Sequence, residues 1–142
     1  MTGKTVLVVE DHEDSRDILC ELLEQNGILA IPAGDGIEAI EKMVRSKPDL
    51  VLTDLHMPNM DGLQLAQYVK SHVAYREIPV ALISANLPSL ENRHPEISAF
   101  LLKPCSIEHL LSTISRLLLS GAESRPDAVS ASLASSADHR AA

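Results

Sequence analysis

The sequence has few aromatic residues and no tryptophan, which limits how its core can be built. Of 142 residues only Tyr68, Tyr75 and Phe100 are aromatic, yet 45% of the residues are hydrophobic and 23% are charged. These proportions are typical of a globular protein. A chain of this length can bury a sizeable core in one domain, with some residues to spare. The core must therefore be aliphatic.

Basic residues, cysteines and long apolar runs are also scarce. The 12 Lys and Arg residues and 20 Asp and Glu residues give a formal net charge of −8, which argues against binding to nucleic acid or to anionic membranes. No apolar run is long enough for a signal peptide or a membrane span, so we expect a cytoplasmic protein. Cys20 and Cys105 lie in helical patterns without metal-ligand or redox spacing, which predicts two buried thiols.

Short apolar runs alternate along the chain with helical patterns. The run at residues 5–9 is continuous and rich in β-branched residues, as in a strand that is buried on both faces. The helical segments have apolar residues three or four positions apart, such as Ile18 and Leu22, or Ile40 and Val44. The expected strands are residues 5–9, 28–33, 50–53, 79–84 and 99–102. The expected helices are residues 15–26, 37 to before Pro48, 62–72 and 107–118, the last with Ser106 as its N-cap.

This alternation predicts an α/β fold, with a parallel sheet, right-handed crossovers and helices on both faces. Residues 86–98 include Pro88 and Pro95 and few apolar side chains, so a helix between the last two strands would be short or irregular. From residue 120 onward Ser and Ala dominate, and apolar periodicity is absent. We therefore expect a folded domain over residues 1–119 and a disordered tail over residues 120–142.

Polar residues stand at the ends of several predicted strands. Glu10 and Asp11 follow the first strand, Asp54 follows the third, Ser84 closes the fourth, and Lys103 follows the fifth. The carboxyl ends of parallel strands meet at one edge of a sheet, where ligands bind near the reversal of strand order. We therefore expect three carboxylates, a hydroxyl and a lysine on a common rim.

Such a rim has a definite chemistry. Each close pair of carboxylates repels by on the order of 1–4 kcal/mol, so either one carboxyl holds a proton or a cation binds. Carboxylate oxygens without His or Cys ligands favour Mg²⁺. A carboxylate beside a metal can attack phosphorus and form an aspartyl phosphate. Lys103 and Ser84 would contact the phosphate oxygens, and Asp54 is the predicted acceptor.

These residues lie in motifs that together resemble the receiver domain of response regulators, over roughly residues 4–119. Each motif alone is weak, but their order and spacing on one βα framework make the resemblance specific. The motifs are the acid pair Glu10-Asp11, the stretch from Leu52 to Gly62 around the phosphorylated aspartate, the hydroxyl position in Ile83-Ser84-Ala85, and Lys103 with its following, usually cis, Pro104.

The resemblance implies a flavodoxin-like, doubly wound sheet of five parallel strands in the order 2-1-3-4-5. It implies that Asp54 accepts a phosphoryl group from the phosphohistidine of a sensor histidine kinase. The chain would then be a stand-alone signalling protein of a two-component system and not an enzyme. The implied Mg²⁺ ligands are the side chains of Asp11 and Asp54, the backbone carbonyl of His56, and Glu10, directly or through water.

In the family, the hydroxyl at the position of Ser84 moves toward the phosphate and is coupled to an aromatic residue, here Phe100. By default, however, Phe100 is an ordinary core residue. The side chain of His56 is either an exposed loop residue without a role or a group that controls hydrolysis of the acyl phosphate. The output is also open: an adaptor that binds an unknown downstream protein, or a phosphorelay intermediate that passes phosphate to a histidine phosphotransfer protein.

One feature departs from the family pattern. Ser84 and Lys103 are only 19 residues apart, and the missing length falls in residues 86–98, which form an interaction face in many receivers. We therefore predict that phosphorylation does not produce a dimer through that face.

Three rival classes fit less well. A binding module of the same fold that is never phosphorylated would not need every site residue to be chemically competent. A phosphatase of the haloacid dehalogenase type needs a second acid where His56 stands. A flavodoxin-like cofactor carrier needs a hydroxyl-rich phosphate loop, where this chain has the acidic segment 11–14.

Overall fold

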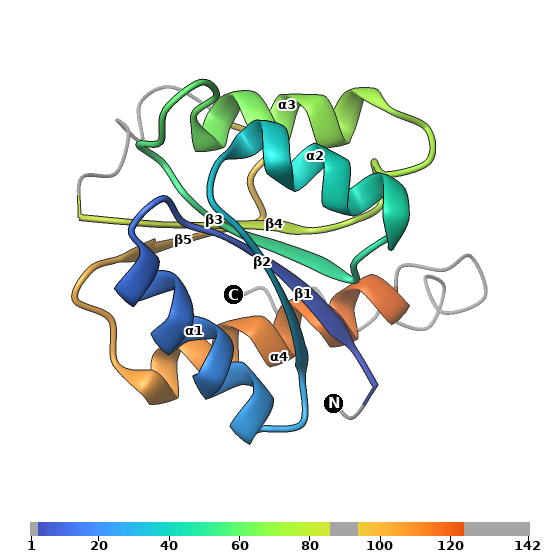
Figure 1. Ribbon diagram of the computed structural model, residues 1–142. Coiled ribbons are helices and arrows are strands. Elements are labelled where there is room, and N and C mark those ends of the chain that lie inside the picture. The colour runs from blue at the N-terminus through green and yellow to red at the C-terminus, as the bar shows by residue number, and fades with distance from the viewer. Residues whose placement is uncertain (1–2, 86–93, 124–142) are drawn as a thin grey trace.

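The structure is a computed structural model that describes residues 3–85 and 94–123. Five parallel strands form one sheet in the order β2-β1-β3-β4-β5, which confirms the predicted fold class and strand order (Figure 1). The strands are β1 (Thr5–Val9), β2 (Leu29–Ala33), β3 (Leu50–Asp54), β4 (Val80–Ser84) and β5 (Ala99–Leu102).

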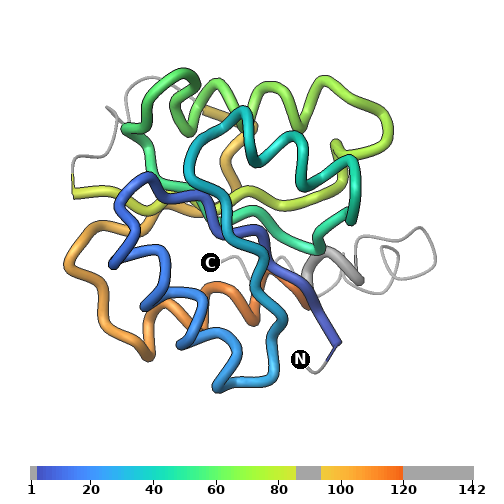
Figure 2. The backbone as a smooth tube through the Cα atoms, viewed as in Figure 1, coloured from blue at the N-terminus to red at the C-terminus, as the bar shows by residue number. Residues whose placement is uncertain are grey.

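Four helices cover the sheet in the described part of the chain. They are α1 (Glu13–Gln25), α2 (Gly36–Arg45), α3 (Gly62–Ser71) and α4 (Ile107–Glu123). Helices α1 and α4 lie on one face of the sheet, and α2 and α3 lie on the other (Figure 1). Figure 2 follows the backbone and shows that β1, β3 and β4 end at the same edge of the sheet, on the left of the view.

The helix ends are set by local capping. The side chain of Asp61 accepts a hydrogen bond from Gln64 N, and the side chain of Gln64 accepts one from Asp61 N, which forms a capping box at the start of α3. Asp35 caps α2, because its side chain accepts a hydrogen bond from Glu38 N. The predicted N-cap of the last helix is confirmed, because Ser106 Oγ accepts a hydrogen bond from His109 N at 3.0 Å.

Two predicted segments differ from the structure or lie partly outside it. Helix α4 continues to Glu123, so the first four residues of the predicted tail are helical. The remainder of that tail, residues 124–142, lies outside the described residues. The predicted short helix at 86–98 falls mostly on residues 86–93, which also lie outside them. Residues 94–98 form a turn and no helix.

The core consists of one hydrophobic cluster on each face of the sheet. One cluster lies between the sheet and α2 and α3, and the other between the sheet and α1 and α4. Every buried hydrophobic side chain in the described residues is aliphatic, as the scarcity of aromatics predicts. Phe100 and Tyr75 are only partly buried and pack against the first cluster.

The exposure of several apolar residues corrects the sequence-based expectations. Ile18 is 65% exposed and Val44 is 68% exposed, although both continue the apolar pattern of their helices. A helix that rests on a sheet buries only one stripe of its surface, so apolar residues at the margin of that stripe stay in water. The expectation of two buried thiols was wrong: Cys20 and Cys105 are half-buried, and Cys105 lies in the loop before α4.

Among the described residues, no helix combines the length and the apolar character that crossing a lipid bilayer requires.

Candidate functional site

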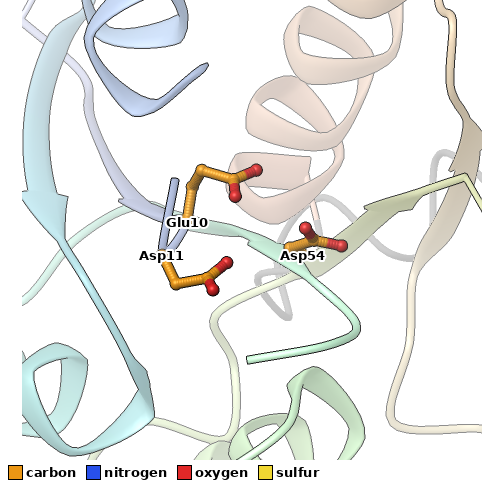
Figure 3. Close-up of side chains that lie close together, drawn as sticks. All are labelled: Glu10, Asp11 and Asp54. Atoms are coloured by element: carbon orange, nitrogen blue, oxygen red, sulfur yellow. The ribbon is translucent and has the colours of Figure 1, made fainter. Parts of the chain in front are cut away.

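Three carboxylates meet where β1 and β3 end. These strands are neighbours in parallel register, with Val9 opposite Thr53, so the residues that follow lie side by side. Glu10, Asp11 and Asp54 each offer a carboxylate oxygen, and these oxygens lie within 4.8 Å of one another. Figure 3 shows the three side chains together at the strand ends. The acid cluster expected from the sequence is thus present.

Glu10 is the most buried member of the cluster, at 2% exposure. Its Oε2 accepts a hydrogen bond from His12 N at 3.0 Å, and its Oε1 accepts one from Lys103 Nζ at 3.1 Å. The backbone oxygen of Glu10 accepts a hydrogen bond from Arg16 Nη1 at 2.9 Å. A buried carboxylate is costly unless it is paired in this way. Sequence reasoning missed Arg16, because no sequence pattern indicates a contact between residues six positions apart.

Lys103 reaches the cluster from the loop after β5. Its Nζ lies 3.1 Å from Glu10 Oε1 and 3.5 Å from Asp54 Oδ2. Burial by itself lowers the pKa of Lys103, but the hydrogen bond to Glu10 and the charges of Asp54 and Glu10 outweigh it, and the net effect raises the pKa. Lys103 is therefore held as a positive charge beside the predicted acceptor.

Asp54 is held from the backbone side as well. Its Oδ1 accepts a hydrogen bond from Leu55 N at 2.7 Å, and Gly62 N donates to Leu55 O at 2.8 Å. A Cβ atom on Gly62 would overlap the backbone oxygen of Asp54 and lie 2.7 Å from Leu82 Cδ1. Glycine thus allows the start of α3 to pack directly against the strand end, a role that the pair Asp61-Gly62 did not reveal in sequence.

The structure also places the remaining predicted site residues. Ser84 is buried at the end of β4, one position beyond the residue that pairs with Asp54. Phe100 lies on β5, and its ring centroid is 6.3 Å from that of His94. His56 is exposed, two residues beyond Asp54. The peptide bond between Lys103 and Pro104 is cis, as the resemblance implies.

The donor set suits a hard divalent cation. In the described residues, the acid cluster contains three carboxylates and no His or Cys. Mg²⁺ prefers such oxygen ligands and commonly binds through one or two carboxylates together with water and phosphate. The residues present therefore fit Mg²⁺.

The chain belongs to the response regulator receiver domain family, whose family model matches residues 6–115. It is therefore a signalling domain of the two-component type. One similar protein is the polar-differentiation response regulator DivK of Brucella anthropi, 30% identical over 118 residues, an alignment that covers 81% of this chain and 96% of that protein.

Solved structures agree with this assignment. The signal receiver domain of a signal transduction histidine kinase from Syntrophus aciditrophicus is 30% identical, with a TM-score of 0.76 over 83% of this chain and 92% of that chain. The response regulator protein TrrA from Thermotoga maritima, in complex with Mg²⁺ and BeF, is 25% identical, with a TM-score of 0.73 over 80% of this chain and 98% of that one. The resemblance seen in the sequence is confirmed.

Proposed function

We propose that this receiver domain accepts a phosphoryl group on Asp54 from the phosphohistidine of a sensor histidine kinase and signals through contacts that depend on phosphorylation. The observation that carries the proposal is the meeting of three carboxylates with Lys103, whose Nζ lies 3.5 Å from Asp54 Oδ2. A carboxylate between a cation site and an ammonium group is suited to phosphoryl transfer.

Glu10, Asp11, Asp54 and the backbone carbonyl of His56 would hold Mg²⁺. The bound ion would neutralise charge on the phosphoryl oxygens. The complex of TrrA with Mg²⁺ and BeF supports this assignment, because that protein shares the fold and a quarter of the aligned residues.

In the transfer step, a carboxylate oxygen of Asp54 forms a bond to phosphorus while the bond from phosphorus to the donor imidazole nitrogen breaks. That nitrogen keeps the electron pair. Lys103, held in place by Glu10, donates a hydrogen bond to one phosphoryl oxygen. Ser84 lies on β4, beside the strand of Asp54, and would move to donate a hydrogen bond to another phosphoryl oxygen. Phe100, on the next strand, would respond to the movement of Ser84.

The proposal is tested by phosphoryl uptake from acetyl phosphate, followed by intact-protein mass spectrometry. The wild type gains one phosphoryl group in Mg²⁺, and the gain is lost with EDTA or in Asp54→Asn. Asp49→Asn is the matched control, because Asp49 is an exposed acid before β3, where it accepts a hydrogen bond from Thr5 N, and this variant keeps full uptake. Uptake in Asp54→Asn, or none in the wild type, contradicts the proposal. Absence of uptake in the wild type would favour the unphosphorylated binding module.

A further inference from the structure

The loop that follows the phosphoryl acceptor is tied to the turn before α2. In this loop, residues 55–61, Asn59 Nδ2 donates a hydrogen bond to Asp35 Oδ2 at 3.0 Å. The other carboxylate oxygen of Asp35 accepts a hydrogen bond from Glu38 N at 2.8 Å and caps α2. One side chain therefore joins the start of α2 to the loop after β3.

A close packing contact lies next to this hydrogen bond. A Cβ atom on Gly36 would lie 2.7 Å from Met60 Cβ and 2.8 Å from Met60 Sδ. Met60 thus rests directly on the first turn of α2, at a distance that only glycine permits. We call the two contacts, Asn59 with Asp35 and Met60 with Gly36, the loop latch.

The latch joins the loop to a neighbouring helix. In the described part of the chain, the other hydrogen bonds of residues 55–61 stay inside the loop or reach its own strand and helix, such as Gly62 N to Leu55 O and Met60 N to Pro58 O. His56 and Pro58 are exposed. Met57 also packs against the core cluster under α2 and α3, and the latch adds the hydrogen bond that joins this loop to the start of α2.

Asn59 is suited to this position for two reasons. Its φ of 73° lies in the left-handed region, which Asn tolerates better than most residues. Its amide also donates to a carboxylate, a stronger hydrogen bond than one between neutral groups. In agreement, hydrogen bonds from Glu38 N and then from Asn59 lower the pKa of Asp35.

We propose that Asp35 and Asn59 are positioning residues of the phosphorylation site, which hold the loop in the conformation that presents the carbonyl of His56 to Mg²⁺. The inference rests on the proposed function, since it concerns the same metal site. Neither residue touches the reacting atoms. They order the backbone carbonyl of His56, a proposed metal ligand, before Mg²⁺ binds. This ordering lowers the entropy cost of binding the metal.

The test compares Asn59→Gly with the double exchange of Asp35→Asn and Asn59→Asp. Glycine keeps the left-handed backbone and removes the donor. The double exchange reverses donor and acceptor and leaves the net charge unchanged. Asn26→Gly is the matched control, because it removes an exposed amide hydrogen bond to Leu22 O at the far end of α1. Mg²⁺ affinity is measured by titration calorimetry, and amide hydrogen exchange at residues 56–60 is measured without metal.

We expect Asn59→Gly to weaken Mg²⁺ binding about 3- to 10-fold, the effect of about one hydrogen bond, and to speed exchange at residues 56–60. The double exchange restores both to within about twofold of wild type, and Asn26→Gly changes neither. The inference is overturned if Asn59→Gly lowers only the unfolding free energy, or if the double exchange restores nothing. If the wild type binds no Mg²⁺, the proposed metal site fails. The metal-free exchange rates then decide the latch alone: unchanged rates in Asn59→Gly refute it.

Discussion

Two half-buried lysines at opposite ends of the sheet show how differently the two ends are built. Lys103, at the carboxyl ends of the strands, donates to the carboxylates of Glu10 and Asp54. Lys70, near the end of α3, donates to the backbone oxygens of Arg76 and Ile78. Burial lowers the pKa of Lys70, and the nearby charge of Glu77 only partly offsets it. The pKa of Lys103 is instead raised, by Glu10 and Asp54.

The difference teaches that the charge of the partner, more than burial, decides the state of a lysine in this fold. Neutral carbonyls accept hydrogen bonds from an ammonium group but do not offset the free-energy cost of removing its charge from water. Carboxylates accept the hydrogen bonds and also offset that cost. At the carboxyl ends of the strands, Lys103 is therefore part of a charged site. At the other end of the sheet, the contacts of Lys70 join α3 to the loop that follows it.

The largest expected effect concerns packing at the carboxyl end. Gly62→Ala would place a methyl group against the backbone oxygen of Asp54 and against Leu82, so we expect the free energy of unfolding to fall by about 3 kcal/mol. Gly34→Ala is the control, because its nearest atom is a flexible Glu38 oxygen at 3.3 Å. It should change stability by less than about 1 kcal/mol. Urea denaturation measures both, and equal effects would show that the end is not tightly packed.

The second effect separates the lysines directly. Lys103→Met leaves Glu10, which is 2% exposed, without its charged partner, so we expect a loss of about 2 kcal/mol at pH 7 without metal. Lys70→Met loses two hydrogen bonds but also removes a half-buried charge, and should cost less than about 1 kcal/mol. Added Mg²⁺ should stabilise Lys103→Met. A greater loss in Lys70→Met would reverse the comparison.

The smallest effect is the pH dependence of these differences. A lowered folded pKa means that the cost of burying Lys70 is full below that pKa and disappears as the pH rises toward the usual value of 10.5. The stability of the wild type relative to Lys70→Met should therefore increase as the pH rises toward 10.5. The contribution of Lys103 should stay constant up to 10.5 and fall only above it, because its pKa is raised.

Both changes should be smaller than the effects of the substitutions at pH 7. Urea unfolding of the wild type and each variant between about pH 8 and pH 11 measures them, and taking differences cancels the groups that titrate in both proteins. Slopes of the same sign for the two lysines would show that their pKa values do not shift in opposite directions.

The sequence alone determined the fold class, the strands, and which residues stand at the strand ends. Glu10, Asp11, Asp54, Ser84 and Lys103 each follow or close an apolar run, and parallel strands bring such residues to one edge whatever the details of packing. The acid cluster can therefore be predicted from the sequence alone.

The tertiary structure decided what holds that cluster in place. Lys103 meets Glu10 across 93 residues of sequence, and Asn59 meets Asp35 across 24. The overlap that forbids a side chain at Gly62 and the exposure of Ile18 also follow only from how helices and loops settle on the sheet. Periodicity describes one segment at a time, whereas each of these features depends on the distance between two segments, which only packing sets.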